Sequence, residues 1–155
     1  MKAVVLIILV ANGLLAGCSS WNVEPKQVAA TNVFSKGQVT VAENGLCDLD
    51  QGKVVTATGD FKWNVTETNN LLFIPNSGAK YSLTTVLDPT SISFQELTVL
   101  TFSARQFEIG LPARNPNANG SIGYVTNEGR YGVFHVDSYS FTGRTITLSW
   151  ITYNK

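Results

Sequence analysis

The sequence has 155 residues, with 11 basic and 11 acidic side chains and a formal net charge of zero. This length suits one domain with its own core, and the balanced charge provides no basic field that would attract nucleic acid. Charged residues make up only 14% of the chain, whereas ordinary soluble domains have about 25%.

The N-terminus has the pattern of an export signal. Met1-Lys2 is a short positive segment, an apolar run covers residues 3–10, and Asn12-Gly13 interrupts it. A membrane-spanning helix needs about 20 apolar residues, so this run is too short to be a membrane anchor. Its length is typical of the apolar region of a secretory signal peptide.

The residues that follow, Leu15-Ala16-Gly17-Cys18, resemble the lipobox of bacterial lipoproteins. This resemblance implies cleavage before Cys18 and acylation of that cysteine, so that lipid anchors the protein to a membrane, since two or more acyl chains hold a protein stably. Ser19, where an aspartate would favour the inner membrane, implies the outer membrane of the bacterial cell envelope. An ordinary signal peptide that happens to contain a cysteine is the alternative.

The sequence therefore divides into three parts: a signal peptide over residues 1–17, a lipidated tether over 18–36, and a β domain over 37–155. The tether contains Pro25, scattered polar residues and no clear period. Fully extended, residues 19–36 would span about 60 Å. Residues 28–34 fit either a short strand or a turn of helix.

Period-two alternation dominates the rest of the chain and predicts an all-β domain. In residues 145–153, Ile146, Leu148 and Trp150 alternate with polar side chains. Strands are also predicted at 39–42, 46–49, 53–57, 60–65, 71–74, 81–86, 92–102, 107–111, 121–126 and 131–141. The predicted strand at 92–102 changes phase, which a bulge near Gln95-Glu96 would explain. The last three strands form an antiparallel meander, and the fold is a single small antiparallel sandwich or barrel.

Most large aromatic side chains fall on the alternating strands, so we expect them in the core rather than on a stacking surface. They are Phe61, Trp63, Phe73, Phe94, Phe134 and Trp150.

Once Cys18 carries lipid, Cys47 is the remaining cysteine, and no intrachain disulfide can form. We expect Cys47 to be a buried free thiol that packs as a small apolar side chain. An intermolecular disulfide and a catalytic thiol are the alternatives, although no base for a catalytic thiol is evident nearby.

His135 is the single histidine, and on a strand it would point the same way as Asp137. This pair supports one alternative function, a hydrolase. No Gly-x-Ser-x-Gly motif supplies a nucleophile, and one histidine with one spare cysteine is too few for a zinc site. We therefore expect no enzyme activity, no metal and no cofactor.

Asp48-x-Asp50-x-Gly52 resembles a fragment of a calcium loop. The same residues fit a hairpin turn in which Asp50 caps the turn and Gly52 supplies a positive φ. The spacing after Gly52 fits the turn better than the calcium loop.

Ser77-Gly78-Ala79-Lys80-Tyr81 resembles the Ser-Gly-x-x-Tyr segment of the small lipoprotein inhibitors of C-type lysozyme. The resemblance implies a β-barrel lipoprotein in which Ser77 and Lys80 contact the enzyme. The Trp-x-Lys-Gly-like segment and the cysteine pair of that family are absent here.

The longest irregular stretch, residues 112–120, contains two prolines, three asparagines and Arg114 as its single charge. Loops held by a rigid scaffold often carry function, and arginine is enriched at binding hot spots. Arg114 is therefore a candidate contact for a partner. Taken together, the sequence favours a non-catalytic envelope lipoprotein that binds an envelope protein, a glycan or a small ligand, or has a structural role.

Overall fold

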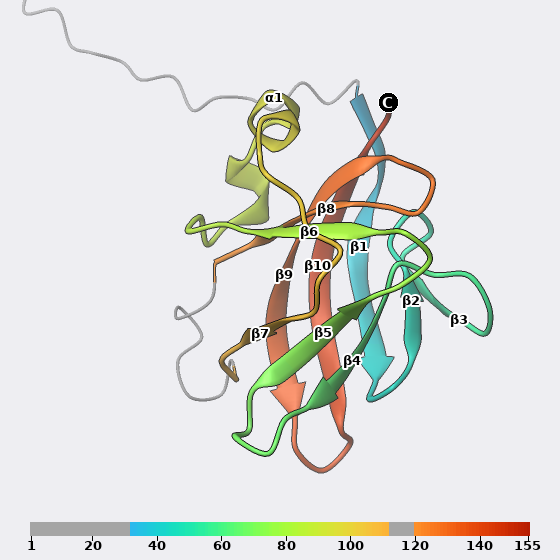
Figure 1. Ribbon diagram of the computed structural model, residues 1–155, viewed down its shortest axis with the longest axis vertical. Helices are drawn as coiled ribbons and strands as arrows, with labels where there is room; N and C mark the ends of the chain where they lie inside the picture. The colour runs from blue at the N-terminus through green and yellow to red at the C-terminus, as the bar shows by residue number, and fades with distance from the viewer. Residues whose placement is uncertain (1–31, 112–119) are drawn as a thin grey trace, which may run out of the picture.

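The computed structural model describes residues 32–111 and 120–155. Within these ranges, ten strands form two antiparallel five-stranded sheets that pack face to face (Figure 1). The all-β prediction is confirmed, and the arrangement is the sandwich rather than the barrel. No helix among the described residues is long and apolar enough to cross a membrane.

The first sheet contains the first and last strands of the described residues, and its strand order is β1-β10-β9-β8-β6. Its strands are β1 (Val33–Ala42), β6 (Lys80–Leu83), β8 (Ile122–Val125), β9 (Tyr131–Ser140) and β10 (Thr145–Tyr153). The predicted meander is confirmed, since β8, β9 and β10 are consecutive neighbours in this sheet. β1 pairs with β10 from Val33↔Tyr153 to Ala42↔Thr145.

The second sheet has the order β3-β2-β4-β5-β7. Its strands are β2 (Leu46–Asp48), β3 (Lys53–Val55), β4 (Phe61–Val65), β5 (Leu71–Pro75) and β7 (Phe107–Ile109). The hairpin from β2 to β3 and the start of β4 lie at one end of this sheet, where they approach the β8–β9 turn of the first sheet.

Aromatic side chains from both sheets fill the space between them. Phe61 on β4 stacks on Phe134 on β9 with ring centroids 5.7 Å apart, and Phe73 on β5 lies 5.5 Å from the same ring. Trp63 is fully buried and donates its indole N–H to the carbonyl of Val41 at 3.2 Å. The aromatic residues predicted for the core are buried, except that Phe94 is half-buried in a second apolar cluster.

That second cluster lies outside the sandwich, on the outer face of the first sheet. Ile92 and Leu97 pack there against Val133 and Tyr153. They belong to a short segment that carries the 3-10 helix η2 (Pro89–Ser91) and the helix α1 (Phe94–Thr98). This segment, the beginning of β1 and the C-terminal end of the chain lie at the same end of the molecule (Figure 1).

The strand predicted at 92–102 is wrong, because α1 occupies its centre. Ser93 and Glu96 form a capping box: the Ser93 amide donates to Glu96 Oε2 at 2.8 Å, and the Glu96 amide donates to Ser93 Oγ at 3.4 Å. This reciprocal pair satisfies amides that a helix start would leave free. The apparent change of phase is thus a helical turn and not a bulge.

The first strand begins earlier than predicted. β1 starts at Val33, so residues 33–36, assigned from sequence to the tether, pair with β10 and belong to the sheet. Phe34 lies against the Arg130 guanidinium, 4.0 Å from its central carbon to the ring centroid.

Candidate functional site

An apolar groove of about 400 Å³ lies beside α1, between the end of β6 and the segment that leads into the helix. Its apolar lining comes from Leu83, Val86, Ile92 and Leu100, with Thr84, Thr85, Ser91 and Glu96 as the polar members. Leu83 is 56% exposed and Val86 is 38% exposed, so two of the apolar side chains that line the groove face solvent.

Hydrogen bonds with Ser121 hold the segment 84–87, part of which lines this groove. The Ser121 amide donates to the Val86 carbonyl at 2.5 Å, and its hydroxyl donates to the Leu87 carbonyl at 2.9 Å. Thr84 Oγ1 donates to the Ser121 carbonyl at 2.7 Å. A side chain at Gly120 would place its Cβ 1.8 Å from the Thr84 carbonyl oxygen, so this close approach requires glycine.

Two predicted site residues, Cys18 and Arg114, lie outside the described residues. The lipid site and the loop contact therefore stay predictions.

Ser77 and Lys80 lie at the β5–β6 turn, at the other end of β6 from the groove. Ser77 has φ +50 and Gly78 has φ +90, as a tight turn requires. Asn76 Nδ2 donates to Ser77 Oγ at 2.8 Å and to the Gly59 carbonyl at 3.0 Å. Both Ser77 and Lys80 are exposed.

His135 and Asp137 lie on the outer face of the first sheet, but no hydrogen bond joins them. Asp137 Oδ2 accepts from Ser149 Oγ at 2.7 Å and from Gln38 Nε2 at 2.9 Å. His135 Nδ1 is buried without a hydrogen-bond partner. A nucleophile and its base must be within hydrogen-bond reach, and here the Ser149 hydroxyl is bound to the carboxylate instead of the imidazole.

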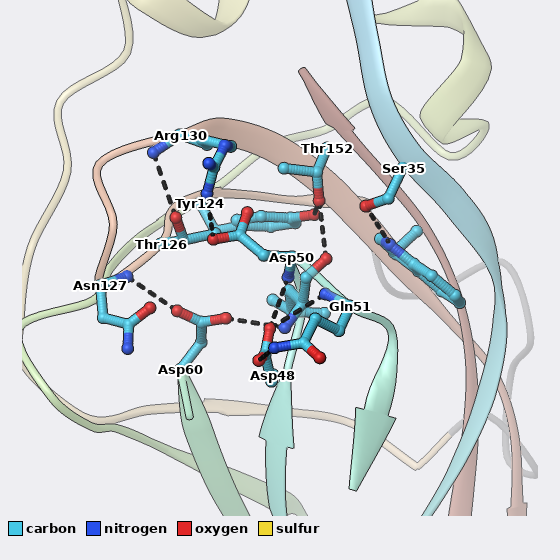
Figure 2. A network of polar contacts seen from close by, with 12 residues as sticks. Ser35, Asp48, Asp50, Gln51, Asp60, Tyr124, Thr126, Asn127, Arg130 and Thr152 are labelled. Atoms are coloured by element: carbon cyan, nitrogen blue, oxygen red, sulfur yellow. Dashed lines mark hydrogen bonds and ion pairs between the residues drawn. The ribbon is translucent and has the colours of Figure 1, made fainter. Parts of the chain in front are cut away.

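A buried polar network joins the two sheets at the β2–β3 end (Figure 2). Asp60, just before β4, accepts from the Leu49 amide at 2.7 Å through Oδ2 and from the Asn127 amide at 2.8 Å through Oδ1. Asp50 Oδ2 pairs with Arg130 Nη1 at 2.9 Å. These bonds connect the β2–β3 turn to the β8–β9 turn.

The side-chain hydroxyls of Tyr124 and Thr152 extend the same network into the interior of the domain. Thr152 Oγ1 donates to the Leu49 carbonyl at 2.7 Å, and the Tyr124 hydroxyl lies 2.6 Å from Thr152 Oγ1. Because the Thr152 proton is used on Leu49, the single proton of the Tyr124 hydroxyl is shared between Thr152 Oγ1 and the Ile151 carbonyl, which lies 3.2 Å away. Both side chains are fully buried, so the network is part of the interior.

The Asp48–Gly52 segment is the turn and not the calcium loop, but its cap is Asp48 instead of Asp50. Asp48 Oδ1 accepts from the amides of Asp50 and Gln51 at 2.9 and 3.0 Å. Gly52 supplies the positive φ, at +60. In the part of the chain that the structure describes, no three His, Cys, Asp or Glu side chains are placed to hold a metal ion.

Burial sets the electrostatics of this region. It raises the pKa of Asp60 to about 6, although the two amide donors act in the opposite direction. Burial, with the nearby carboxylates Asp60 and Asp48, raises the pKa of the Cys47 thiol to about 12. Cys47 is a free and fully buried thiol, as predicted.

Neither the groove nor the polar network was predicted from the sequence. Asp50 and Arg130 are 80 positions apart, and Asp60 and Asn127 are 67 apart. Only the packing of the two sheets against each other brings these residues together. The Ser93-x-x-Glu96 motif was the available signal for the helix that borders the groove.

Comparison with known proteins gives no match: no family model, curated protein or solved structure is similar to this chain.

Proposed function

We propose that this protein is a lipid-anchored, non-catalytic binding protein of the bacterial envelope, and that the groove beside α1 takes a small, largely apolar ligand. The groove carries this proposal. Its volume of about 400 Å³ falls in the range of about 300–1,000 Å³ typical of small-molecule sites. An apolar wall with a few polar groups at its rim is the usual lining of such sites.

The position of the chain start supports a membrane-proximal site. The Asn32 carbonyl accepts from the Asn154 amide at 2.8 Å, and Val33 packs in the cluster that contains Ile92 and Leu97. A lipid on Cys18 would be joined to this end of the domain by residues 18–31, which span at most about 50 Å. The groove would then lie at the end of the domain that the tether joins to the membrane.

The test uses a soluble form that begins at Ser19, with 8-anilinonaphthalene-1-sulfonate as an apolar fluorescent probe. We expect the probe to bind with enhanced fluorescence, and we expect Leu83→Lys to weaken binding at least tenfold. Val54→Lys is the matched control, because Val54 is 49% exposed on β3 in the other sheet. Equal binding by both variants would remove the groove from the proposal.

A further inference from the structure

A second hollow, of about 310 Å³, lies beside β6 and shares Leu83 with the groove. The rings of Tyr81 and Phe107 line this second hollow with their centroids 5.5 Å apart, so part of its wall is apolar. Tyr81 and Leu83 are two positions apart on β6, which is about 7 Å along a strand. The groove and the second hollow are therefore neighbours, and one elongated molecule can occupy both.

The second wall of this hollow comes from the chain that leaves α1, passes β6 and continues to β7 (Figure 1). The Tyr81 amide donates to the Ser103 carbonyl at 2.9 Å, and the Ser103 amide donates to the Tyr81 carbonyl at the same distance. The Arg105 amide donates to Ser103 Oγ at 3.1 Å. These bonds fix the backbone that carries Arg105, so the hollow is formed before a ligand arrives, as most small-molecule sites are.

Arg105 is the charged residue that lines the second hollow. Its side chain is exposed, and within residues 32–111 and 120–155 its guanidinium takes part in no ion pair. The nearby carboxylate of Glu108 accepts from Asn70 Nδ2 at 3.2 Å instead. A guanidinium presents a planar fork of donors that matches the two oxygens of a carboxylate or a phosphate.

The groove carries a charge of the opposite sign. The carboxylate of Glu96 lines it and accepts from the amide and the hydroxyl of Ser93 at 2.8 and 2.6 Å. An anionic group is repelled at this carboxylate and attracted at Arg105. The two charges therefore favour one orientation of a bound molecule, with its anionic end in the second hollow and its apolar part in the groove.

We propose that the groove and the second hollow together bind a single-chain amphiphile whose head group is an anion, either a carboxylate or a phosphate. The alkyl chain lies in the groove against Leu83, Ile92 and Leu100, and the head group pairs with the Arg105 guanidinium. Binding is reversible and no covalent bond changes. This inference rests on the proposed function, because it assigns a class of ligand to the same groove.

The first experiment compares octanoate, octyl phosphate and 1-octanol, which have the same alkyl chain and different head groups. The protein is the polypeptide of residues 19–155, which contains all ten strands. Displacement of the neutral fluorescent probe N-phenyl-1-naphthylamine at neutral pH gives the three affinities. We expect at least one anion to bind about five- to tenfold more tightly than octanol. The tighter of the two anions identifies the head group.

Arg105→Gln should bring the affinities for both anions down to that for octanol. Arg105→Lys should keep part of the preference, because an ammonium group attracts an anion but cannot form the planar fork. Lys36→Gln is the matched control: it removes an exposed cation from β1, at the opposite edge of the first sheet from β6, and should keep the full preference.

Leu83→Ser separates this inference from the proposed function, because it removes an apolar contact without changing the charge. It should weaken the binding of all three compounds. If the wild type binds octanol as tightly as both anions and Leu83→Ser weakens octanol, the groove is an apolar site and the amphiphile inference is wrong. If none of the three compounds binds, the proposed function is wrong as well.

The second experiment locates the head group. In nitrogen-15-edited NMR, the Arg105 Nε–H signal should shift when the preferred anion is added and should stay in place when octanol is added. An equal shift with octanol, or an unmoved signal while the anion binds, would place the head group elsewhere and overturn the inference.

Discussion

Gly52 lies against the indole of Trp150, so that a Cβ at position 52 would fall 1.8 Å from Trp150 Cζ2. Gly52 belongs to the β2–β3 turn of one sheet and Trp150 to β10 of the other. The contact therefore positions the turn whose Asp50 reaches across to Arg130.

Gly52→Ala should destabilise the domain by about 2–4 kcal/mol, because the methyl group meets the indole and the residue has a positive φ. Gly78→Ala is the control: its φ is also positive, at +90, but nothing lies within 4 Å of its Cβ position. That variant should lose only about 1 kcal/mol. Equal losses in urea unfolding would mean that the Trp150 contact contributes nothing.

Asp60→Ala should cost about 2–4 kcal/mol, since the buried amides of Leu49 and Asn127 would both lose their acceptor. The raised pKa of Asp60 makes its contribution to stability decline as the pH rises from about 4 to about 6. Asp60→Asn removes this titration, so its stability should decline less over that interval. Chemical denaturation at pH 4 and pH 7 measures both effects, and Asp137→Asn, on the exposed face, should change stability by about 0.5 kcal/mol or less.

Cys47 should be unreactive in the folded protein. The thiolate is the reactive form, and the thiol is fully buried with its pKa raised to about 12. In a Cys18→Ala background, where Cys47 is the only thiol, 5,5′-dithiobis(2-nitrobenzoate) should label it only after unfolding. Rapid labelling of the native protein would indicate an exposed thiol, as the intermolecular disulfide and catalytic alternatives require.

Cys18→Ala should leave the precursor uncleaved and without lipid, because the lipobox resemblance makes this cysteine the acylated residue. Labelling of cells with radioactive palmitate, followed by electrophoresis, distinguishes the two forms. A Ser20→Ala variant should be processed normally. Cleavage of the Cys18→Ala precursor at the same bond would favour the ordinary signal peptide.

His135→Ala should retain the function that a deletion strain reveals, because Asp137 is bound to Ser149 and Gln38 and not to the imidazole. Leu83→Lys should impair that function, since it alters the groove. Complementation of the deletion strain, with protein levels checked by immunoblot, measures both. Failure of a folded His135→Ala protein to complement would revive the hydrolase alternative.

Period-two patterns allowed most strands to be predicted because one face of each is buried. β10 matches its predicted range of 145–153, with Ile146 and Leu148 fully buried. α1 was missed because its five residues give too little length for a helical period to appear beside neighbouring strands. The Ser93-x-x-Glu96 capping motif was the one sequence feature that indicated the start of this helix.

The polar network could not be predicted, because each of its turns looks like an ordinary surface turn in the sequence. Asp50 and Arg130 are local turn residues by every sequence criterion. The burial of Asp50 and its ion pair with Arg130 follow from the way the two sheets stack, which no local pattern encodes. The two prediction failures thus have different causes: a weak local signal in one case and a purely long-range arrangement in the other.

The pairing of β1 with β10 also determines when the domain can be completed. Val33 pairs with Tyr153 and Ala42 with Thr145, so the first strand of the described residues has to wait for the last. Contacts between such distant segments form slowly, and an exported chain would reach its final sheet only after nearly all of it had been translocated. Until then both edges of β1 are unpaired, which leaves this strand open to pairing with other chains.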